Sequence, residues 1–144
     1  MSHDVYESEC AKQTGICILN FLPNIYDSSA KERTRYLDTV KGLAKANRGK
    51  PIKVFWLQAG DQLTIERQLG LEFGFPASLA LSPTKKKYAV MRGTFSADGV
   101  KSFVERITIG NEPLQDLRVE LKFSKVDLWD GKDAAPIEEE PLDV

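Results

Sequence analysis

The stretch FGFPASLAL, residues 73–81, decides the fold of this 144-residue chain. Its second part, Ala77 to Leu81, is an apolar run that predicts a strand. The turn residues Ser82 to Lys86 follow, so Lys87 to Met91 is expected to return beside that strand as an antiparallel partner. Pro76 therefore stands at the entrance of a predicted hairpin.

Two strands and a helix are predicted before this hairpin. Ile16 to Leu22 (ICILNFL) is nearly all apolar, which is typical of a strand covered on both faces in a parallel sheet. Ile52 to Leu57 is the next strand. Between them, Ser29 and Glu32 have the spacing of a capping box, so a helix is expected to begin there. The connection is long enough for a right-handed strand–helix–strand crossover.

Two more helices are expected, one on each side of the hairpin. Asp61 is expected to cap a short helix that Gly70 ends in a left-handed conformation. Ser96 is expected to cap the last helix, which ends at Gly110. At the start of the chain, Val5-Tyr6 is expected to form a short edge strand and Ser8 to Lys12 a short helix.

The segment after the last helix shows little regular structure. Val119, Leu121 and Phe123 alternate, which predicts an extended segment lying on the body, with Trp129 as an anchor. Residues 1–126 are taken as the domain and residues 127–144 as an acidic, disordered tail.

The tail has a strong charge. Seven acids and one base give it −6, so the net charge of −1 leaves +5 for residues 1–126. Four readings stay open: a solvated tail, loose docking on the body, a protein partner, or calcium capture. Calcium binding would be weak, because no loop holds six or more oxygens in place.

The predicted order is strand, helix, strand, helix, strand, strand, helix, with a strand and a short helix in front. A parallel strand–helix–strand half joined to an antiparallel hairpin and a final helix is the thioredoxin topology. This is an α/β fold with a mixed central sheet flanked by helices. Thioredoxin folds keep a cis-proline at the position of Pro76, so the Phe75–Pro76 bond is expected to be cis.

The thiol pair that redox thioredoxins place opposite this proline is missing. The matching loop, Pro23 to Ser28, contains no cysteine. The spacing of Cys10 and Cys17 does not match a C-x-x-C motif, and with one histidine they do not make a zinc site. Either they form a disulfide in an oxidising compartment, or Cys17 is a buried structural residue and Cys10 is unpaired. No catalytic and no metal-binding residue is assigned.

Other functional templates are also missing from the sequence. It has no G-x-G-x-x-G, Walker loop or G-x-S-x-G. The only histidine, His3, lies in a three-residue start that does not look native, so it is a poor base. The carboxylates Asp61, Glu66 and Glu72 are taken as cap and helix-surface charges.

Nucleic acid and membrane are not expected as partners. Lys85-Lys86-Lys87 is too small for a nucleic-acid footprint and is expected to form a solvated hairpin tip. No apolar run approaches the roughly 18–20 residues needed to span a bilayer. The candidate binding surface is instead the remnant of the thioredoxin groove: Ile25, Tyr26, Phe75 and Pro76. Phe75 could equally belong to the core.

Four segments carry a resemblance to a known family. These are FLPNIYDSSAKERTRYLDTV, FWLQAGDQLTIERQLGLEFGFPASLAL, KKKYAVMRGTFSADGVKSFVERITIG and LWDGKDAAPIEEE. They resemble the C-terminal, non-catalytic thioredoxin-like domain of protein disulfide isomerases of the A-six type, over roughly Val5 to Glu140. The chain departs from that family at Leu71-Glu72-Phe73, where a glycine-rich stretch is usual, and at Leu142–Val144, which is no retrieval signal.

The resemblance implies a location and partners. It implies a protein of the endoplasmic reticulum lumen that assists protein folding, with dithiol–disulfide exchange carried out by neighbouring domains. It implies that this domain binds unfolded clients or partner chaperones, including the lumenal Hsp70, and that the tail binds calcium weakly. It also favours a structural disulfide between Cys10 and Cys17. The competing hypothesis is a divergent thioredoxin-fold oxidoreductase or transferase that uses Cys17 as a single thiol.

Overall fold

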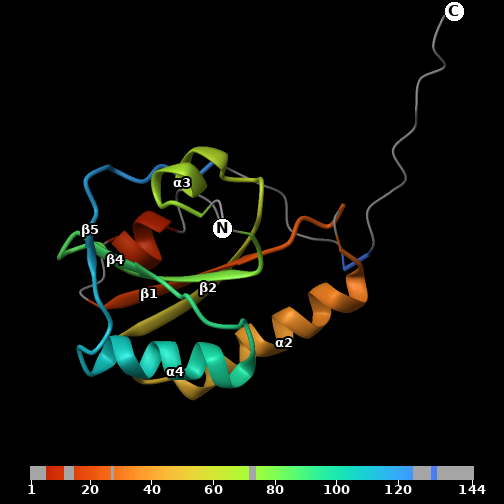
Figure 1. Cartoon of the computed structure of the whole chain (residues 1–144), viewed down its shortest axis with the longest axis horizontal. Helices are drawn as coiled ribbons and strands as arrows, with labels where there is room; N and C mark the ends of the chain where they lie inside the picture. Colours follow the sequence, from red (N-terminus) through yellow and green to blue (C-terminus); the bar gives the residue numbers. More distant parts are fainter. Residues whose placement is uncertain (1–5, 12–14, 27, 72–73, 125–130, 133–144) are drawn as a thin grey trace, which may run out of the picture.

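The computed structural model of the chain describes residues 6–11, 15–26, 28–71, 74–124 and 131–132. In these residues, four helical segments surround one five-stranded sheet of order β2-β1-β3-β4-β5 (Figure 1). The strands are β1 (Ile16–Leu22), β2 (Ile52–Gln58), β3 (Ala77–Ser82), β4 (Lys87–Val90) and β5 (Gln115–Asp116). The helices are η1 (Tyr6–Ala11), α2 (Ala30–Ala46), α3 (Leu63–Gln68) and α4 (Ala97–Thr108).

Strand β1 lies inside the sheet and organises it. It runs parallel to β2, with Ile16 opposite Ile52, and antiparallel to β3, with Phe21 opposite Ala77. Every residue of β1 after Ile16 is buried. A strand that is covered on both faces has no solvent side, and this explains its nearly continuous apolar sequence. The prediction of such a strand, of the crossover and of the β3–β4 hairpin is confirmed.

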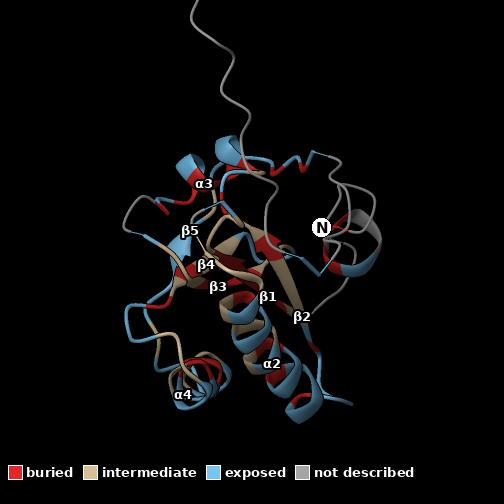
Figure 2. Ribbon diagram, turned by 90° about the vertical axis from the view of Figure 1, so that its right-hand side faces the viewer, coloured by how far each residue is buried: buried red, intermediate tan, exposed pale blue. Residues whose placement is uncertain are grey.

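The two faces of the sheet carry two separate cores. Helices η1 and α3 cover one face, and helices α2 and α4 cover the other (Figures 1 and 2). Because side chains alternate along a strand, β1 sends Leu19 and Phe21 into the first core and Ile18 into the second. Leu43 of α2 and Phe103 of α4 join Ile18, while Ile65 of α3 joins Leu19.

The two long helices begin at the caps that the sequence predicts. The Ser29 hydroxyl accepts a hydrogen bond from the Glu32 backbone N–H at 3.1 Å, at the start of α2. The Ser96 hydroxyl accepts one from Gly99 at 3.0 Å, at the start of α4. Each bond satisfies a donor that the first helical turn leaves without a partner.

The third helix differs from the prediction in two ways. Asp61 is not its cap: α3 begins after Gln62, and an Asp61 carboxylate oxygen accepts a hydrogen bond from the Gln58 side-chain amide at 2.9 Å. Glu66 is not a surface charge, because its side chain is buried and both carboxylate oxygens accept from the Gly60 backbone N–H. Gly70 does end this helix with a left-handed φ of 71°.

The start of the described chain is helical, so the prediction of an edge strand at Tyr6 is wrong. Tyr6 begins η1 and packs its ring on Phe123, with 4.6 Å between the ring centroids. The helix predicted for Ser8 to Lys12 overlaps η1, which starts two residues earlier; Lys12 lies outside the described residues. The C-terminal segment lies on the body as expected, with Leu121 and Phe123 buried and Val119 exposed. Val5, Trp129 and most of the tail lie outside the described residues.

Candidate functional site

The predicted groove residues lie on two segments at one end of the strands β1 and β3. Phe21 of β1 pairs with Ala77 of β3, so the loop that leaves β1 at Pro23 and the segment that enters β3 through Pro76 meet at the same end. The peptide bond between Phe75 and Pro76 is cis. This is the relation between proline and loop that defines the thioredoxin groove.

The loop after β1 is bound to the end of β2 by side-chain hydrogen bonds. The Asn24 amide donates to the Ala59 carbonyl at 3.1 Å, and its carbonyl oxygen accepts from the Tyr26 N–H at 3.0 Å. The Gln58 side-chain oxygen accepts from the Ile25 N–H at 3.1 Å. These bonds satisfy loop backbone groups that a strand ladder no longer pairs, and they fix the loop conformation.

A buried arginine also forms hydrogen bonds with this loop and with the end of β2. Arg33, in the first turns of α2, is 1% exposed, and one terminal nitrogen donates to the Pro23 carbonyl and to the Gln58 side-chain oxygen, both at 2.7 Å. Its guanidinium carbon lies 5.4 Å from the centre of the Trp56 ring, a cation–π distance. The sequence analysis assigned Arg33 no role, because one arginine in a charged helix gives no signal of burial.

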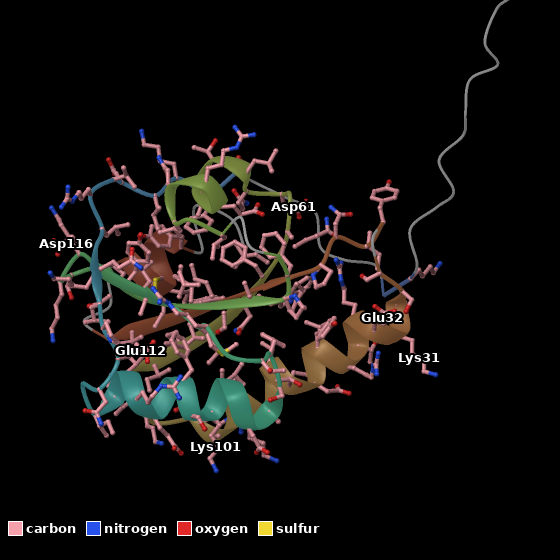
Figure 3. The ribbon with its side chains drawn as sticks, viewed as in Figure 1. Lys31, Glu32, Asp61, Lys101, Glu112 and Asp116 are labelled. Atoms are coloured by element: carbon pink, nitrogen blue, oxygen red, sulfur yellow. A yellow bond between two sulfur atoms is a disulfide. The ribbon has the colours of Figure 1, made fainter. Side chains whose placement is uncertain are left out.

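Charge also acts at this end of the sheet. Burial lowers the pKa of the Arg33 guanidinium from its ordinary value, and the Asp61 carboxylate raises it again in part. Asp61 follows β2 at the upper end of the molecule, whereas Glu32 lies lower, in the first turn of α2 (Figure 3). An arginine guanidinium stays protonated in proteins, so Arg33 carries its positive charge here.

A second buried polar group lies on the strands beneath the site. The Ser78 hydroxyl donates to the Asn20 side-chain oxygen, and the Asn20 amide donates to the Phe55 carbonyl, both at 2.9 Å. Asn20 and Ser78 are fully buried and face each other in the β1–β3 register. The network links β2, β1 and β3 next to Pro76. Its only sequence signal is a lone Asn in the run ICILNFL.

The four predicted surface residues differ in their surroundings. Tyr26 is 65% exposed, whereas Ile25, Phe75 and Pro76 are half-buried. Phe75 packs on the first core, with its ring 6.4 Å from that of Phe21. The structure therefore brings the loop and the proline segment together at one end of the strands, and Tyr26 is the most exposed of the four predicted residues.

The two cysteines lie away from this end of the strands. Cys10 of η1 and Cys17 of β1 are joined by a disulfide, and neither sulfur-bearing side chain is exposed. Cys17 lies five residues before the end of β1, which places it about 17 Å along the strand from the loop. Among the described residues, no three His, Cys, Asp or Glu side chains are grouped so that they could hold a metal ion. In the same part of the chain, no helix is long and apolar enough to cross a membrane.

This arrangement agrees with the family whose sequence pattern the chain matches. Residues 1–112 match the pattern described as "PDIA6-like, C-terminal thioredoxin-like domain". The chain belongs to this family. The predicted kinship with the C-terminal domain of A-six-type disulfide isomerases is thereby confirmed.

Individual relatives extend over nearly the whole PDIA6-like domain. It is 35% identical to protein disulfide isomerase-like 2-3 of Oryza sativa subsp. japonica over 95% of its length. It is 33% identical to the protein disulfide-isomerase A6 homolog of Drosophila melanogaster over all of it. The domain covers 31% and 34% of these two proteins, so it spans about a third of the relatives that it matches.

A solved structure supports the fold. The first two thioredoxin domains of Eps1p from Naumovozyma dairenensis superpose with a TM-score of 0.54 at 11% identity, covering 74% of this domain and 39% of that chain. Such a likeness shows the fold alone. It confirms the prediction of a thioredoxin-like α/β fold with a mixed sheet flanked by helices.

Proposed function

We propose that this PDIA6-like domain is a non-catalytic binding domain of a protein disulfide isomerase of the endoplasmic reticulum lumen. It binds unfolded clients or partner chaperones while neighbouring domains exchange disulfides. One observation carries the proposal: the loop beside Pro76 has no thiol, and the only two cysteines of the chain are bonded to each other elsewhere.

The chemistry of disulfide exchange explains why this matters. The attacking group is a thiolate, which must reach the sulfur of the disulfide that it opens. The sequence from Pro23 to Ser28 contains hydroxyl, amide and carboxylate side chains but no thiol. A reaction through Cys17 alone, as the competing transferase hypothesis requires, would first need its bond to Cys10 broken inside a closed core.

The loop has properties of a binding surface. Tyr26 is a large exposed aromatic side chain, and such residues supply much of the energy at interfaces. The Tyr26 backbone N–H donates a hydrogen bond to the Asn24 side chain, and the Ile25 backbone N–H donates one to the Gln58 side chain. A loop that is already ordered loses little conformational entropy on binding. We place clients, or the lumenal Hsp70, on Tyr26 and the adjoining Ile25, Phe75 and Pro76, and weak calcium binding on the acidic tail.

The non-catalytic part is tested by thiol chemistry. The purified chain is assayed for insulin reduction and for oxidation of a dithiol peptide, beside a no-protein control. We expect the same rate as the control in both assays. Turnover above that control, lost in Cys10→Ser or Cys17→Ser, would overturn the proposal in favour of the single-thiol enzyme.

The binding part is tested by a matched pair of substitutions. Tyr26→Asp is compared with Ile109→Asp, since Ile109 is equally exposed (68%) but follows α4. Fluorescence anisotropy measures binding of a labelled, reduced and alkylated model client and, separately, of purified lumenal Hsp70. We expect Tyr26→Asp to weaken binding about fivefold or more, the effect of about 1 kcal/mol at a hot spot. If both substitutions weakened binding equally, the surface around Tyr26 would be ruled out as the binding site.

A further inference from the structure

A basic concavity lies at the end of the molecule opposite the groove. It has a volume of about 640 Å³ and opens between the last turns of α2 and the first residues of β2. Half of its ten lining residues are cations, namely Lys41, Lys45, Arg48, Lys50 and Lys53, and none is an acid. We call these five residues the basic pocket. They lie in a stretch, residues 39–60, that contains no acidic residue.

The charges of the basic pocket are not neutralised by the described part of the domain. All five side chains are exposed, and none forms an ion pair with a described residue. Lys50 also lines the neighbouring groove between α2 and α4, whose lining includes the acids Asp98 and Glu105, whereas the other four cations do not line that groove. Five like charges around one concavity repel each other and attract an anionic chain.

Two simpler explanations cover only part of the pocket. Lys45 lies in the last turn of α2 and there stabilises the helix dipole. Lys53 lies on the edge strand β2, where a lysine discourages pairing with another sheet. Neither explanation applies to Arg48 or Lys50, which follow the helix. The edge lysine also argues against an occupant that adds a strand, and for one that binds through its side-chain charges.

The same chain contains a segment of matching charge. Residues 133–143 carry five acids, Asp133, Glu138, Glu139, Glu140 and Asp143, and no base. The five acids equal the five cations of the basic pocket in number.

This acidic segment can also reach the pocket. Ser124 is hydrogen-bonded to Gln62, near the far end of β2 from the pocket, and β2 is about 20 Å long. The structure also describes residues 131–132, which lie on the side of the molecule where α2 starts (Figure 1), and the 17 residues of α2 span about 25 Å. Glu138 to Asp143 lie 6 to 11 residues beyond Lys132. An extended chain of that length spans at most about 20–36 Å, enough to follow α2 to the basic pocket.

We infer that residues 133–143 dock on the basic pocket of their own domain through charge. The contact covers the five cations of the basic pocket. This inference does not depend on the groove or on the proposed function.

Paramagnetic relaxation enhancement tests the contact in the full chain. Because Cys10 and Cys17 are bonded, Leu142→Cys adds a single thiol for a spin label. We expect broadening of backbone amides around Lys45, Arg48 and Lys50 at low salt. The broadening should disappear when ionic strength rises from 0.01 M to 1 M, because the screening length falls from about 30 Å to about 3 Å.

Charge variants provide the controls. Lys45→Glu, Arg48→Glu and Lys50→Glu together should abolish the broadening, whereas reversal of three exposed lysines elsewhere, Lys85→Glu, Lys86→Glu and Lys122→Glu, should leave it. Labelled chain mixed with isotope-labelled, spin-free chain should show none. Broadening that is absent, that survives 1 M salt, that centres on Lys85–Lys86, or that appears in the mixture would each overturn docking within one chain.

Discussion

The side chain of Gln62 exchanges two hydrogen bonds with the backbone of Ser124, 62 residues later in the sequence. Its amide nitrogen donates to the Ser124 carbonyl at 2.9 Å, and its oxygen accepts from the Ser124 N–H at 2.8 Å. The Gln62 side chain thus mimics one rung of a sheet. It binds the C-terminal segment beside α3, where Leu121 and Phe123 enter the first core.

Replacing Gln62 by alanine should release this segment. The substitution leaves the Ser124 N–H and carbonyl without their partner, and we expect the free energy of unfolding to fall by about 1–3 kcal/mol. Urea denaturation measures the fall, and hydrogen exchange should quicken at residues 121–124. Gln68→Ala, at an exposed position of α3, is the control and should change stability little. Equal losses for both variants would contradict a specific role for Gln62.

The Cys10–Cys17 disulfide should stabilise the domain and resist native reduction. It closes a loop with a sequence separation of seven, for which the loss of denatured-state entropy contributes about 2–3 kcal/mol. Denaturation with and without a strong reductant measures this. The double variant Cys10→Ser/Cys17→Ser should have the denaturation midpoint of the reduced domain, and the reductant should not change that midpoint. Because both side chains are buried, an alkylating reagent with mild reductant should label neither cysteine until the domain unfolds. Rapid labelling of the native chain would be the contrary result.

Two glycines should respond oppositely to the same substitution. A Cβ on Gly15 would lie 2.0 Å from the Pro51 carbonyl oxygen, where the start of β1 meets β2, so Gly15→Ala should cost about 1–3 kcal/mol. Gly42 lies in α2 with nothing within 4 Å of its would-be Cβ, so Gly42→Ala should add up to about 1 kcal/mol through helix propensity. Thermal melting of the pair checks both signs. A stabilising Gly15→Ala would mean that the two strand starts can separate.

Arg33 should determine the order of the loop at the groove. Arg33→Met keeps most of the buried volume but leaves the Pro23 carbonyl and the Gln58 oxygen without a charged donor. We expect a loss of about 1–3 kcal/mol together with faster amide exchange at Ile25 and Tyr26. Arg35→Met, two residues on and exposed, is the matched control. If the loss of stability came without faster exchange in the loop, Arg33 would support the helix rather than the groove.

Elements that depend on local chemistry could be predicted from the sequence. The cap at Ser29 needs only a hydroxyl three residues before a free N–H, and the β3–β4 hairpin needs only two apolar runs around a turn. The continuous apolar run of β1 indicated its interior position, because only a strand covered on both faces tolerates it. These features also fixed the place of Pro76 and of the loop without thiols.

Features that depend on distant partners could not be predicted in this way. The sequence suggests that Asp61 caps a helix, but its carboxylate accepts a hydrogen bond from the Gln58 side-chain amide, and α3 starts at Leu63. Glu66 looks like a surface charge, but the fold brings the Gly60 N–H to it. Tyr6 lies in η1 and packs on the ring of Phe123, more than a hundred residues later in the sequence. A single sequence carries no local signal of such contacts.

The Cys10–Cys17 disulfide also bears on whether an unfolded chain could be bound covalently or only non-covalently. With Cys10 and Cys17 bonded to each other and buried, this domain has no free thiol. The proposed binding of a client through Tyr26 and its neighbours would therefore be non-covalent and would leave no mixed disulfide. A mixed-disulfide complex captured on the full-length protein would therefore report on sulfurs outside this domain, and this domain's contacts would be lost from such a record.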